Sequence, residues 1–475
     1  MMGKIKFGTD GWRAIIADDF TFENVGIAAQ AVADFINSQK GRIYRQKKVV
    51  VGYDTRFLSD KFAEKVSSVL AANGINVILS DEPCPTPSVS FYIKKFKLTG
   101  GIMITASHNP AAYNGLKYKG YFGGSAGSDI IDAIEKKLYK GKVRELPFEE
   151  CVKTKIIKRT DIITTQISFI RKYADMKVLK KAKIRVLVDS MNGTGGTHLK
   201  EVLAGSGVKL KFINAEINPS FKGRAPEPNE KHLGDFALAV KRGKYDLGEA
   251  TDGDADRLGI VDEKGTVLTG HKLMALLLLH LLENRKMRGG VIQTICGTGL
   301  ITKMCKEYGV KQYETPVGFK YICELMTTKD ILLGGEETGG IGFKNYIPER
   351  DGFLSALLIM ELMVSMKKPL SGIVDWMNNK YGNYVYERLD VLFPADKRGM
   401  IMGGLKKTPL KEVLGNKVVS VNTSDGYKYI CENGSWLLVR FSGTEPKLRI
   451  YSETSSKETS LKYLDFGKKF AFGMM

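Results

Sequence analysis

The chain has 475 residues but only six cysteines, and they are scattered without a C-x-x-C pair. This scarcity excludes the ligand spacing of a common zinc site and the cysteine framework of a small disulfide-bonded domain. The opening residues, MMGKIKFGTDGWRA, also lack the apolar stretch of a secretory signal peptide. We therefore expect a cytoplasmic protein with reduced thiols.

Long hydrophobic runs are absent as well. The longest, LMALLLLHLL at 273–282, has about half the length that a helix needs to span a bilayer. It predicts a buried helix, and no membrane partner is expected.

Two familiar nucleotide-binding motifs are missing from the glycine-rich turns. GTGGTH (193–198) and GTGLIT (297–302) place His198 and Thr302 where a dinucleotide fingerprint requires glycine. No P-loop sequence occurs either. These segments are interpreted as tight turns between a strand and a helix, and a dinucleotide cofactor is not expected.

The formal net charge is +20, from 72 basic and 52 acidic residues. The lysines are dispersed along the chain, and no nucleic-acid-binding motif accompanies them. Such a composition is typical of a solvated surface, so a nucleic-acid partner would rest on net charge alone. A basic chain does favour a small phosphorylated substrate.

A β-α-β pattern recurs along the chain. Its copies begin at KVVVGYDTR (48–56), AKIRVLVDSMNGTGG (182–196) and GGVIQTICGTG (289–299), and each continues into an amphipathic helix, a glycine and a second strand. Chance could produce such units in any α/β protein, but their shared helix–glycine–strand exit favours three related mixed α/β domains. We predict domains at 1–155, 156–262 and 263–383.

The pattern of apolar and polar residues changes after residue 383. YVYERLDVLF, GSWLLVRF and LRIYSE alternate as strands do, and helical stretches are predicted at 405–414 and 456–471. Residues 384–475 are therefore predicted to form a C-terminal α+β domain.

A polar loop follows an apolar run in IMITASHNPAAYNGLK (102–117). Pro110 disfavours helix at Asn109, so Ser107 is predicted to lie on a loop after a strand. An ordinary surface turn is one interpretation. The adjacency of Ser107 and His108 is weak support for catalysis by itself, because catalytic Ser–His pairs usually meet in space.

Three aspartates alternate in EATDGDADRLGIVDEKG (249–265), at Asp252, Asp254 and Asp256. In an extended segment or tight loop they can converge on one hard divalent cation, and we expect Mg²⁺. An EF-hand would need glycine where Arg257 stands, and helices where the flanks resemble strands. A purely structural acidic turn is the other alternative.

Two further loops carry binding chemistry. GGEETGG (334–340) offers Glu336 and Thr338 to sugar hydroxyls between glycines that let a ligand approach the backbone. RFSGTEPKLRIY (440–451) combines Arg440, a Ser-Gly-Thr turn and Arg449, which suits a phosphate group.

Taken together, TASHNPAAYNGLK, DGDADR, GEETG and RFSGTEP resemble the loops of the α-D-phosphohexomutase superfamily in order and spacing. FGTDGWRA, VGYDTR and PTPSVSF match too, and the resemblance to the phosphoglucomutase/phosphomannomutase branch spans the whole chain. The resemblance implies four domains around a central cleft, with one motif loop from each domain.

The reaction that the resemblance implies interconverts hexose 1-phosphate and hexose 6-phosphate, for glucose, mannose or both. Ser107 would carry the transferable phosphoryl group, bridged by Mg²⁺ to the three aspartates. The substrate would pass through a 1,6-bisphosphate, which also serves as primer.

The resemblance also assigns roles to individual residues. Those expected in catalysis are Ser107, His108, Lys117 and Arg13, where Lys117 would transfer a proton only if its pKa were lowered. Those expected to bind substrate are Arg257, Lys320, Glu336, Thr338, Arg440, Ser442, Gly443, Thr444 and Arg449, and those expected at the metal are Ser107, Asp252, Asp254 and Asp256.

One departure from the superfamily pattern affects the sugar loop. Gly339-Gly340 stands where some relatives have Gly-His, which argues against a histidine acid or base there and against a phosphoglucosamine mutase. Thr338 replaces a commoner serine but keeps the hydroxyl. Two alternatives to a mutase stay open: a hexose 1,6-bisphosphate synthase on the same scaffold, and a non-catalytic phosphosugar-binding protein.

Overall fold

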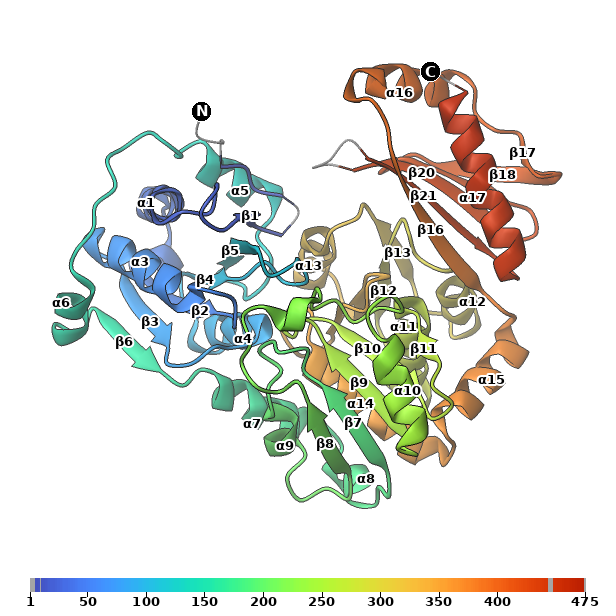
Figure 1. Ribbon diagram of the computed structural model, residues 1–475, viewed down its shortest axis with the longest axis horizontal. Coiled ribbons are helices and arrows are strands. Elements are labelled where there is room, and N and C mark those ends of the chain that lie inside the picture. Colours follow the sequence, from blue (N-terminus) through green and yellow to red (C-terminus); the bar gives the residue numbers. More distant parts are fainter. Residues whose placement is uncertain (1–4, 9, 443–446, 474–475) are drawn as a thin grey trace. The chain divides into compact units, whose positions relative to one another are not determined.

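The computed structural model describes residues 5–8, 10–442 and 447–473 (Figure 1). The chain divides into two compact units. The first comprises Met1–Arg288 and Gly318–Ser371, and the second comprises Gly289–Val317 and Gly372–Met475.

The first sheet of the first unit has the strand order β1-β5-β4-β2-β3-β6. Strands β4, β2, β3 and β6 run parallel, whereas β5 is antiparallel to both β4 and β1. The strands are β1 (Trp12–Ile15), β2 (Lys48–Tyr53), β3 (Asn76–Ser80), β4 (Gly100–Ile104), β5 (Tyr113–Gly120) and β6 (Ile157–Thr160).

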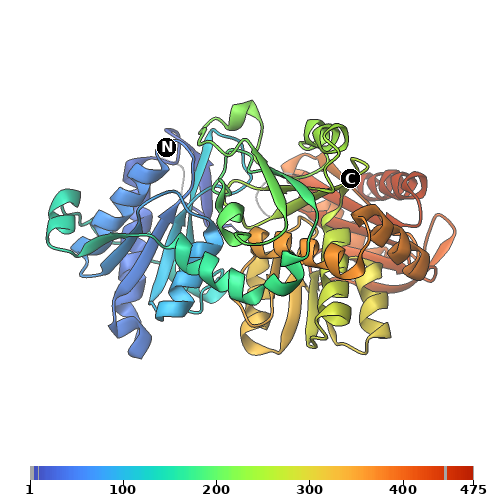
Figure 2. The same cartoon turned by 90° about the horizontal axis from the view of Figure 1, so that it is seen from below.

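Helices cover both faces of this sheet (Figure 1, Figure 2). Val49 and Val51 of β2 join the core beneath α1 (Phe22–Ser38) and α3 (Ser59–Ala72), whereas Gly52 of the same strand faces α4 (Thr86–Phe96). Alternate side chains of a strand point to opposite faces of the sheet. Because helices cover both faces, a run such as Val49–Val51 is buried throughout. The shorter helices α2 (Arg42–Arg45), α5 (Ser128–Glu135) and α6 (Phe148–Lys153) complete this part.

The second sheet has the order β11-β10-β9-β7-β8, with β9, β7 and β8 parallel and β10 antiparallel to β9. The second copy of the β-α-β pattern contributes to this sheet, and its helix is shorter than predicted. Within 197–207 only His198–Val202 is α-helical. The strands are β7 (Arg185–Asp189), β8 (Lys209–Ile213), β9 (Leu247–Thr251), β10 (Leu258–Asp262) and β11 (Val267–Leu268). The helices are α7 (Ile163–Tyr173), α8 (Met176–Lys180), α9 (His198–Val202), η1 (Phe221–Gly223) and α10 (Gly234–Arg242).

The apolar run 273–282 lies in a buried helix, as predicted: α11 (Gly270–Leu279) continues into a π-helical turn, His280–Asn284. Helix α14 (Gly352–Met366) is also almost wholly buried, and Asp351 caps its first turn by accepting a hydrogen bond from Leu354 N–H. No helix among the described residues is long and apolar enough to cross a membrane. The first unit also contains α13 (Phe319–Thr328) and the antiparallel strands β14 (Ile331–Gly335) and β15 (Ile341–Phe343).

The second unit begins with a parallel pair, β12 (Gly290–Thr294) and β13 (Gln312–Thr315), joined through α12 (Gly299–Glu307). Its C-terminal sheet has the order β16-β21-β20-β19-β18-β17 and is antiparallel. Helix α15 (Leu370–Tyr381) precedes this sheet, with α16 (Arg398–Lys407) and α17 (Lys457–Phe472) beside it. The strands are β16 (Val385–Leu392), β17 (Glu412–Val413), β18 (Asn416–Asn422), β19 (Tyr427–Cys431), β20 (Trp436–Phe441) and β21 (Lys447–Thr454).

The predicted fold class, mixed α/β sheets followed by a C-terminal α+β domain, is confirmed. The helix predicted at 405–414 was misplaced, because α16 ends at Lys407 and Glu412–Val413 form a strand. Pro409 explains the end, since proline restricts the preceding residue and cannot donate its own N–H. The helix begins earlier than predicted and buries Ile401 and Leu405 against the C-terminal core.

Candidate functional site

Ser107 lies on a tight loop directly after β4, as predicted. Its φ is +52°, a left-handed conformation that costs energy for a residue other than glycine and often marks a functional position. The Ser107 N–H donates to Thr105 Oγ1 at 2.8 Å, and its hydroxyl donates to Asp252 Oδ2 at 3.0 Å. The serine hydroxyl is therefore buried against the loop that carries Asp252, Asp254 and Asp256, called the aspartate loop or acidic loop below.

Arg56 stabilises this serine loop through its backbone carbonyl groups. Its guanidinium donates to the carbonyl oxygens of Ser107, Asn109 and Pro110, at 2.7, 2.6 and 2.8 Å. Asp54 fixes the guanidinium in turn, with a distance of 3.1 Å from Arg56 Nε to Asp54 Oδ2. The VGYDTR segment thus supports the loop that carries the serine, a role that the sequence analysis did not assign.

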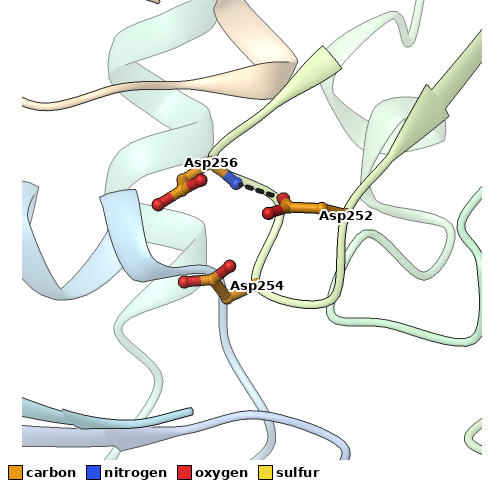
Figure 3. A group of neighbouring side chains, drawn as sticks. All are labelled: Asp252, Asp254 and Asp256. Atoms are coloured by element: carbon orange, nitrogen blue, oxygen red, sulfur yellow. Dashed lines mark hydrogen bonds between the residues drawn. The ribbon is translucent and has the colours of Figure 1, made fainter. Parts of the chain in front are cut away.

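The three aspartates lie on the loop between β9 and β10 and point toward one another (Figure 3). Their ligand oxygens all lie within 4.8 Å of one another. Asp252 Oδ1 accepts the backbone N–H groups of Asp256 and Arg257, at 3.0 and 3.1 Å, which closes the loop. This closure brings the alternating carboxylates around one point.

The electrostatics of this cluster suit a divalent cation. Burial and the neighbouring carboxylates of Asp256 and Asp254 raise the pKa of Asp252 well above its usual range. Asp254 Oδ1 and Asp256 Oδ1 are buried and accept no hydrogen bond among the described residues. Free hard oxygens and crowded negative charge are what Mg²⁺ would satisfy, so the residues present fit this ion.

Lys117 reaches the same cluster from β5, whose register pairs it with Met103 of β4. Its ammonium lies 2.8 Å from Asp254 Oδ2, 2.9 Å from Asp10 Oδ2 and 3.5 Å from Asp256 Oδ2. Burial acts to lower the pKa of Lys117, but these three carboxylates outweigh it and the pKa is raised. The lowered pKa considered for a proton-accepting lysine is thus not found, and Lys117 carries its proton in this arrangement.

Arg350 is a central residue that the sequence analysis missed. Its guanidinium lies 2.7 Å from Asp10 Oδ2, 2.8 Å from Asp256 Oδ2 and 3.3 Å from Glu336 Oε2. Only 2% of Arg350 is exposed, so each of these ion pairs is shielded from water. Arg350 therefore links the N-terminal segment, the aspartate loop and the predicted sugar loop.

Asp10 was also missed, although it lies within the quoted FGTDGWRA segment. Besides Lys117 and Arg350, it faces Lys119, whose ammonium is 3.4 Å from Asp10 Oδ1 and 2.5 Å from Glu349 Oε2. Burial acts to raise the pKa of Asp10, but the surrounding cations dominate and hold it well below its usual range. Such buried, multiply paired charges are a feature of functional sites.

The predicted sugar loop lies beside the aspartate loop, because Leu258 N–H donates to Gly339 O at 3.2 Å. Burial raises the pKa of Glu336 to about 6, against the opposing effect of Arg350. The Thr338 hydroxyl is buried without a hydrogen-bond partner among the described residues. Both side chains therefore offer polar groups that protein contacts leave incompletely satisfied.

Two further predicted residues, Arg13 and His108, lie at the serine loop, and a third, Lys320, lies elsewhere. Arg13 donates to Asn109 Oδ1 at 2.8 Å. Burial and the cations Arg257 and Arg13 lower the pKa of His108 well below its usual range, so the imidazole is neutral. Lys320 is placed differently: its ammonium donates to the Ser128 hydroxyl at 2.9 Å.

The second unit contains the predicted phosphate-binding arginines. Arg440 and Arg449 lie directly opposite each other on the paired strands β20 and β21. Asp425 Oδ2 accepts a hydrogen bond from Arg440 Nε at 2.8 Å, whereas Arg440 Nη1 is buried without a partner among the described atoms. Two adjacent guanidiniums form a suitable anion site. Ser442 is buried at the end of β20, and the predicted Gly443 and Thr444 lie outside the described residues.

Comparison with known proteins agrees with this arrangement along the whole chain. The models of phosphoglucomutase/phosphomannomutase domains match consecutive segments: domain I at 4–145, II at 166–265, III at 269–381 and the C-terminal domain at 402–466. The chain belongs to the phosphoglucomutase/phosphomannomutase family. Members of this family use a metal ion, and the Asp252–Asp254–Asp256 cluster could hold one in this chain.

Individual members of the family are similar over nearly their full length. A phosphoglucomutase/phosphomannomutase of Thermococcus kodakarensis is 33% identical, with 98% of each chain covered. A phosphoglucosamine/phosphogalactosamine mutase of Sulfurisphaera tokodaii is 31% identical, covering 99% of this chain and 100% of that protein. A crystal structure from Thermus thermophilus, described as a phosphomannomutase, is 32% identical with a TM-score of 0.87 and covers 100% of both chains.

Membership in the family makes this phosphoglucomutase/phosphomannomutase homologue an enzyme of the isomerase class, a hexose-phosphate mutase. The substrates of its relatives are phosphorylated sugars, but the names of those relatives include both neutral and amino sugars. Within the first unit, the structure brings together the predicted Ser107, Lys117 and three aspartates, and adds Asp10, Arg56 and Arg350.

Proposed function

We propose that this chain interconverts the 1- and 6-phosphates of glucose, mannose or both, through a phosphorylated Ser107 and a hexose 1,6-bisphosphate. The observation that carries the proposal is the contact between Ser107 and the acidic loop. The serine Oγ lies on a left-handed turn, 3.0 Å from Asp252 Oδ2, beside three converging carboxylates. A phosphoryl group on this oxygen would lie next to the metal position.

In the first half-reaction, the bond between phosphorus and Ser107 Oγ breaks while a bond forms between phosphorus and the free hydroxyl oxygen of the sugar. The hydroxyl proton passes to a base, and the leaving Ser107 oxygen takes a proton from Lys117, which regenerates the serine alcohol. Mg²⁺, held by Asp252, Asp254 and Asp256 with the serine oxygen, would supply charge stabilisation to the transferring group. The second half-reaction is the reverse transfer from the other end of the bisphosphate.

The cations around Ser107 suit this transfer. Lys117 and Arg13 lie near the serine loop and can stabilise negative charge on the phosphoryl oxygens. Because Lys117 is protonated in this arrangement, we assign it to charge stabilisation and proton donation to the serine oxygen. His108 is neutral and can contact phosphate, whereas its lowered pKa makes it a weak proton acceptor.

Substrate recognition is proposed for residues of the aspartate loop, the sugar loop, helix α13 and the C-terminal phosphate motif. Glu336 and Thr338 would accept and donate hydrogen bonds to sugar hydroxyls, and Arg257 would lie between them and the metal. Lys320 would face the substrate once its hydrogen bond to the Ser128 hydroxyl is broken. Arg440, Ser442, Gly443, Thr444 and Arg449 would hold the phosphate that is not reacting.

An amino-sugar substrate is the second candidate. It is favoured by the phosphoglucosamine/phosphogalactosamine mutase among the relatives. Gly339-Gly340 argues against it, because no histidine follows the sugar loop. The assembled serine and aspartates disfavour a non-catalytic binding protein. A hexose 1,6-bisphosphate synthase would use the same groups and stays an open alternative.

The deciding experiment is one coupled assay with glucose 1-phosphate, mannose 1-phosphate and glucosamine 1-phosphate, each with Mg²⁺ and a trace of the matching 1,6-bisphosphate. We expect turnover of the first, the second or both, with at least about tenfold lower kcat/KM for the third. Preferred turnover of glucosamine 1-phosphate would overturn the substrate assignment. In a parallel assay with a separate phosphoryl donor, accumulation of stoichiometric bisphosphate would instead identify a synthase.

The domain boundaries 155/156, 262/263 and 383/384 and a cytoplasmic location are part of the proposal. Limited proteolysis tests the boundaries, because cleavage concentrates at exposed connections between compact segments.

A further inference from the structure

A groove with a volume of about 1000 Å³ lies in the first unit. Its walls are the C-terminal part of α4, one face of α7 and the segments 326–331 and 343–348. None of the residues assigned above to the reaction lines it. A volume of this size is typical of a small-molecule site, so the groove is large enough for an additional ligand.

The floor of the groove is aromatic. Phe91 of α4, Phe169 of α7 and Tyr346 form one cluster, with ring centroids 5.0 Å apart for Phe91–Phe169 and 5.3 Å apart for Phe169–Tyr346. The rings of Phe169 and Tyr346 are stacked, with an interplanar angle of 14°. Such a surface favours a planar, apolar group over an extended polar one.

The rim of the groove is basic. It carries Lys94, Lys95, Lys172, Lys329 and Lys344 against one carboxylate, Asp330. Lys344 forms an ion pair with Asp330 at 2.5 Å, and Lys94 donates to Tyr346 O. Lys172 and Lys329 are exposed and line the groove from different segments, α7 and 326–331. The surplus of positive charge around an aromatic floor favours an anion that also carries a ring.

We propose that this groove binds a nucleotide, with its base on the aromatic floor and its phosphates at the lysine rim. A bare phosphate would use the rim but make no contact with the aromatic floor. An uncharged nucleoside would use the floor but bring no anion to the exposed Lys172 and Lys329. A nucleoside diphosphate satisfies both parts.

Helix α4 connects this groove with the aspartate loop. Lys94 and Lys95 line the groove near the C-terminal end of the helix, and Phe91 lines it from the middle. At the other end, Thr86 N–H donates to Asp254 O at 3.0 Å and the Thr86 hydroxyl donates to Asp254 Oδ2 at 2.5 Å. A shift of this helix on ligand binding would therefore move a group that contacts Asp254.

The segment 346–351 forms a second connection. Tyr346 lines the groove, and its hydroxyl donates to Asp351 Oδ2 at 2.7 Å. The adjacent Arg350 lies 2.8 Å from Asp256 Oδ2. Because both connections end on the acidic loop, a nucleotide in the groove acts as an effector of the site, with a coupling that must be reciprocal.

Binding is tested on the full-length protein by equilibrium dialysis with labelled ADP, so this readout does not depend on the proposed reaction. We expect saturable binding that weakens by about tenfold or more in the double variant Lys172→Glu/Lys329→Glu, since reversing two rim charges repels the phosphates. Lys40→Glu reverses an exposed lysine that does not line the groove and should bind ADP normally. Thermal unfolding checks that the double variant is folded.

Competition distinguishes the alternatives. Pyrophosphate and adenosine should each displace ADP much less effectively than unlabelled ADP does. Equal displacement by pyrophosphate would overturn the role of the aromatic floor. No saturable binding, or binding lost in Arg440→Ala but kept in the double variant, would overturn the site.

The effector role has its own test in the mutase assay at saturating free Mg²⁺. ADP should change kcat or KM of the wild-type protein by at least about twofold and leave the double variant unaffected. Normal ADP binding with no kinetic effect would overturn the coupling while supporting the binding site. Inhibition of both proteins alike would show that ADP acts at the catalytic site.

Discussion

Arg350 Nη2 lies 2.8 Å from Oδ2 of Asp256, and the two residues are separated by 94 positions of the chain. The same guanidinium also contacts Asp10 and Glu336. An aspartate proposed to hold the metal and a glutamate proposed to hold the sugar therefore share one buried cation. This arrangement makes Arg350 a positioning residue for both groups.

Replacing Arg350 by lysine should lower kcat/KM by about 10²-fold, because an ammonium cannot hold several carboxylates in fixed directions as a guanidinium does. We expect much of the loss in KM for the sugar phosphate, through Glu336, while phosphate on Ser107 persists. Steady-state kinetics and intact-protein mass spectrometry measure the two effects. Arg288→Lys, at an exposed arginine, is the control. A wild-type KM would contradict the positioning role.

Ser107→Ala should reduce turnover by at least about 10³-fold, because the variant lacks the oxygen that carries the phosphoryl group. The fold should survive, since alanine keeps the backbone and removes one hydroxyl. Labelling with ³²P-hexose 1,6-bisphosphate followed by peptide mapping checks the assignment, with Ser38→Ala as control. Phosphoenzyme that still forms in Ser107→Ala would refute it.

Asp254→Asn should weaken Mg²⁺ binding by about tenfold or more and slow phosphoryl transfer, because one of three anionic ligands becomes neutral. The Mg²⁺ dependence of the initial rate and direct titration of binding measure both effects. Asp235→Asn, at an exposed carboxylate, should behave as the wild type. Full wild-type activity in excess chelator would show that the cluster needs no metal.

Local patterns made much of this site predictable. The run before Ser107 ends at a loop because Asn109 precedes proline, and the spacing of Asp252, Asp254 and Asp256 is itself a signal for converging carboxylates. Neither prediction needed knowledge of distant contacts. The repeated strands were likewise visible, because their β-branched runs are buried on both faces.

The ion-pair network was not predictable in this way. Asp10 and Arg350 are 340 positions apart, and each is of a residue type that usually lies on the surface. Only the tertiary fold places them together, and burial strengthens the attraction between their charges because water no longer screens it. The same holds for Lys119 and Glu349, whose side chains are fully buried although charged residues are usually exposed.

Glu249 is a buried carboxyl beside the acidic loop whose charge should make stability depend on pH. Neither of its oxygens has a hydrogen-bond partner among the described residues, and burial raises its pKa from 4.5 to about 8. Below pH 4.5 the carboxyl is neutral in both states, so its stabilising effect is complete there. Stability is lost as the pH rises toward 8, because the unfolded chain releases the proton first.

Between pH 4.5 and 7 this difference should lower the free energy of unfolding by on the order of 3 kcal/mol. Glu249→Gln removes the ionisable group, so its stability relative to the wild type should increase from pH 5 to pH 8. Thermal unfolding without divalent metal measures the trend, and Glu230→Gln, at an exposed carboxylate, is the control. A pH-independent difference would show that Glu249 is not protonated in the folded protein.

Arg440 provides the last test, on the phosphate that does not react. Its Nη1 is buried without a described partner while Asp425 orients its Nε, so the guanidinium is prepared for an anion. Both half-reactions need one phosphate held while the other reacts, and a bisphosphate that is held poorly should escape. Arg440→Ala should therefore raise KM for monophosphates and release more bisphosphate, at a cost of about 2–4 kcal/mol in binding.

Ser107 should stay phosphorylated in Arg440→Ala, because the hydrogen bonds of Ser107 come from Thr105, Arg56 and Asp252. Mass spectrometry of the purified variant measures the phosphoserine, and chromatography follows the escaping bisphosphate. Lys417→Ala, at an exposed lysine of the same antiparallel sheet, should leave both quantities unchanged. An unchanged KM without released intermediate would show that the distal phosphate is bound elsewhere, since a lost charge-assisted contact cannot be silent in both quantities.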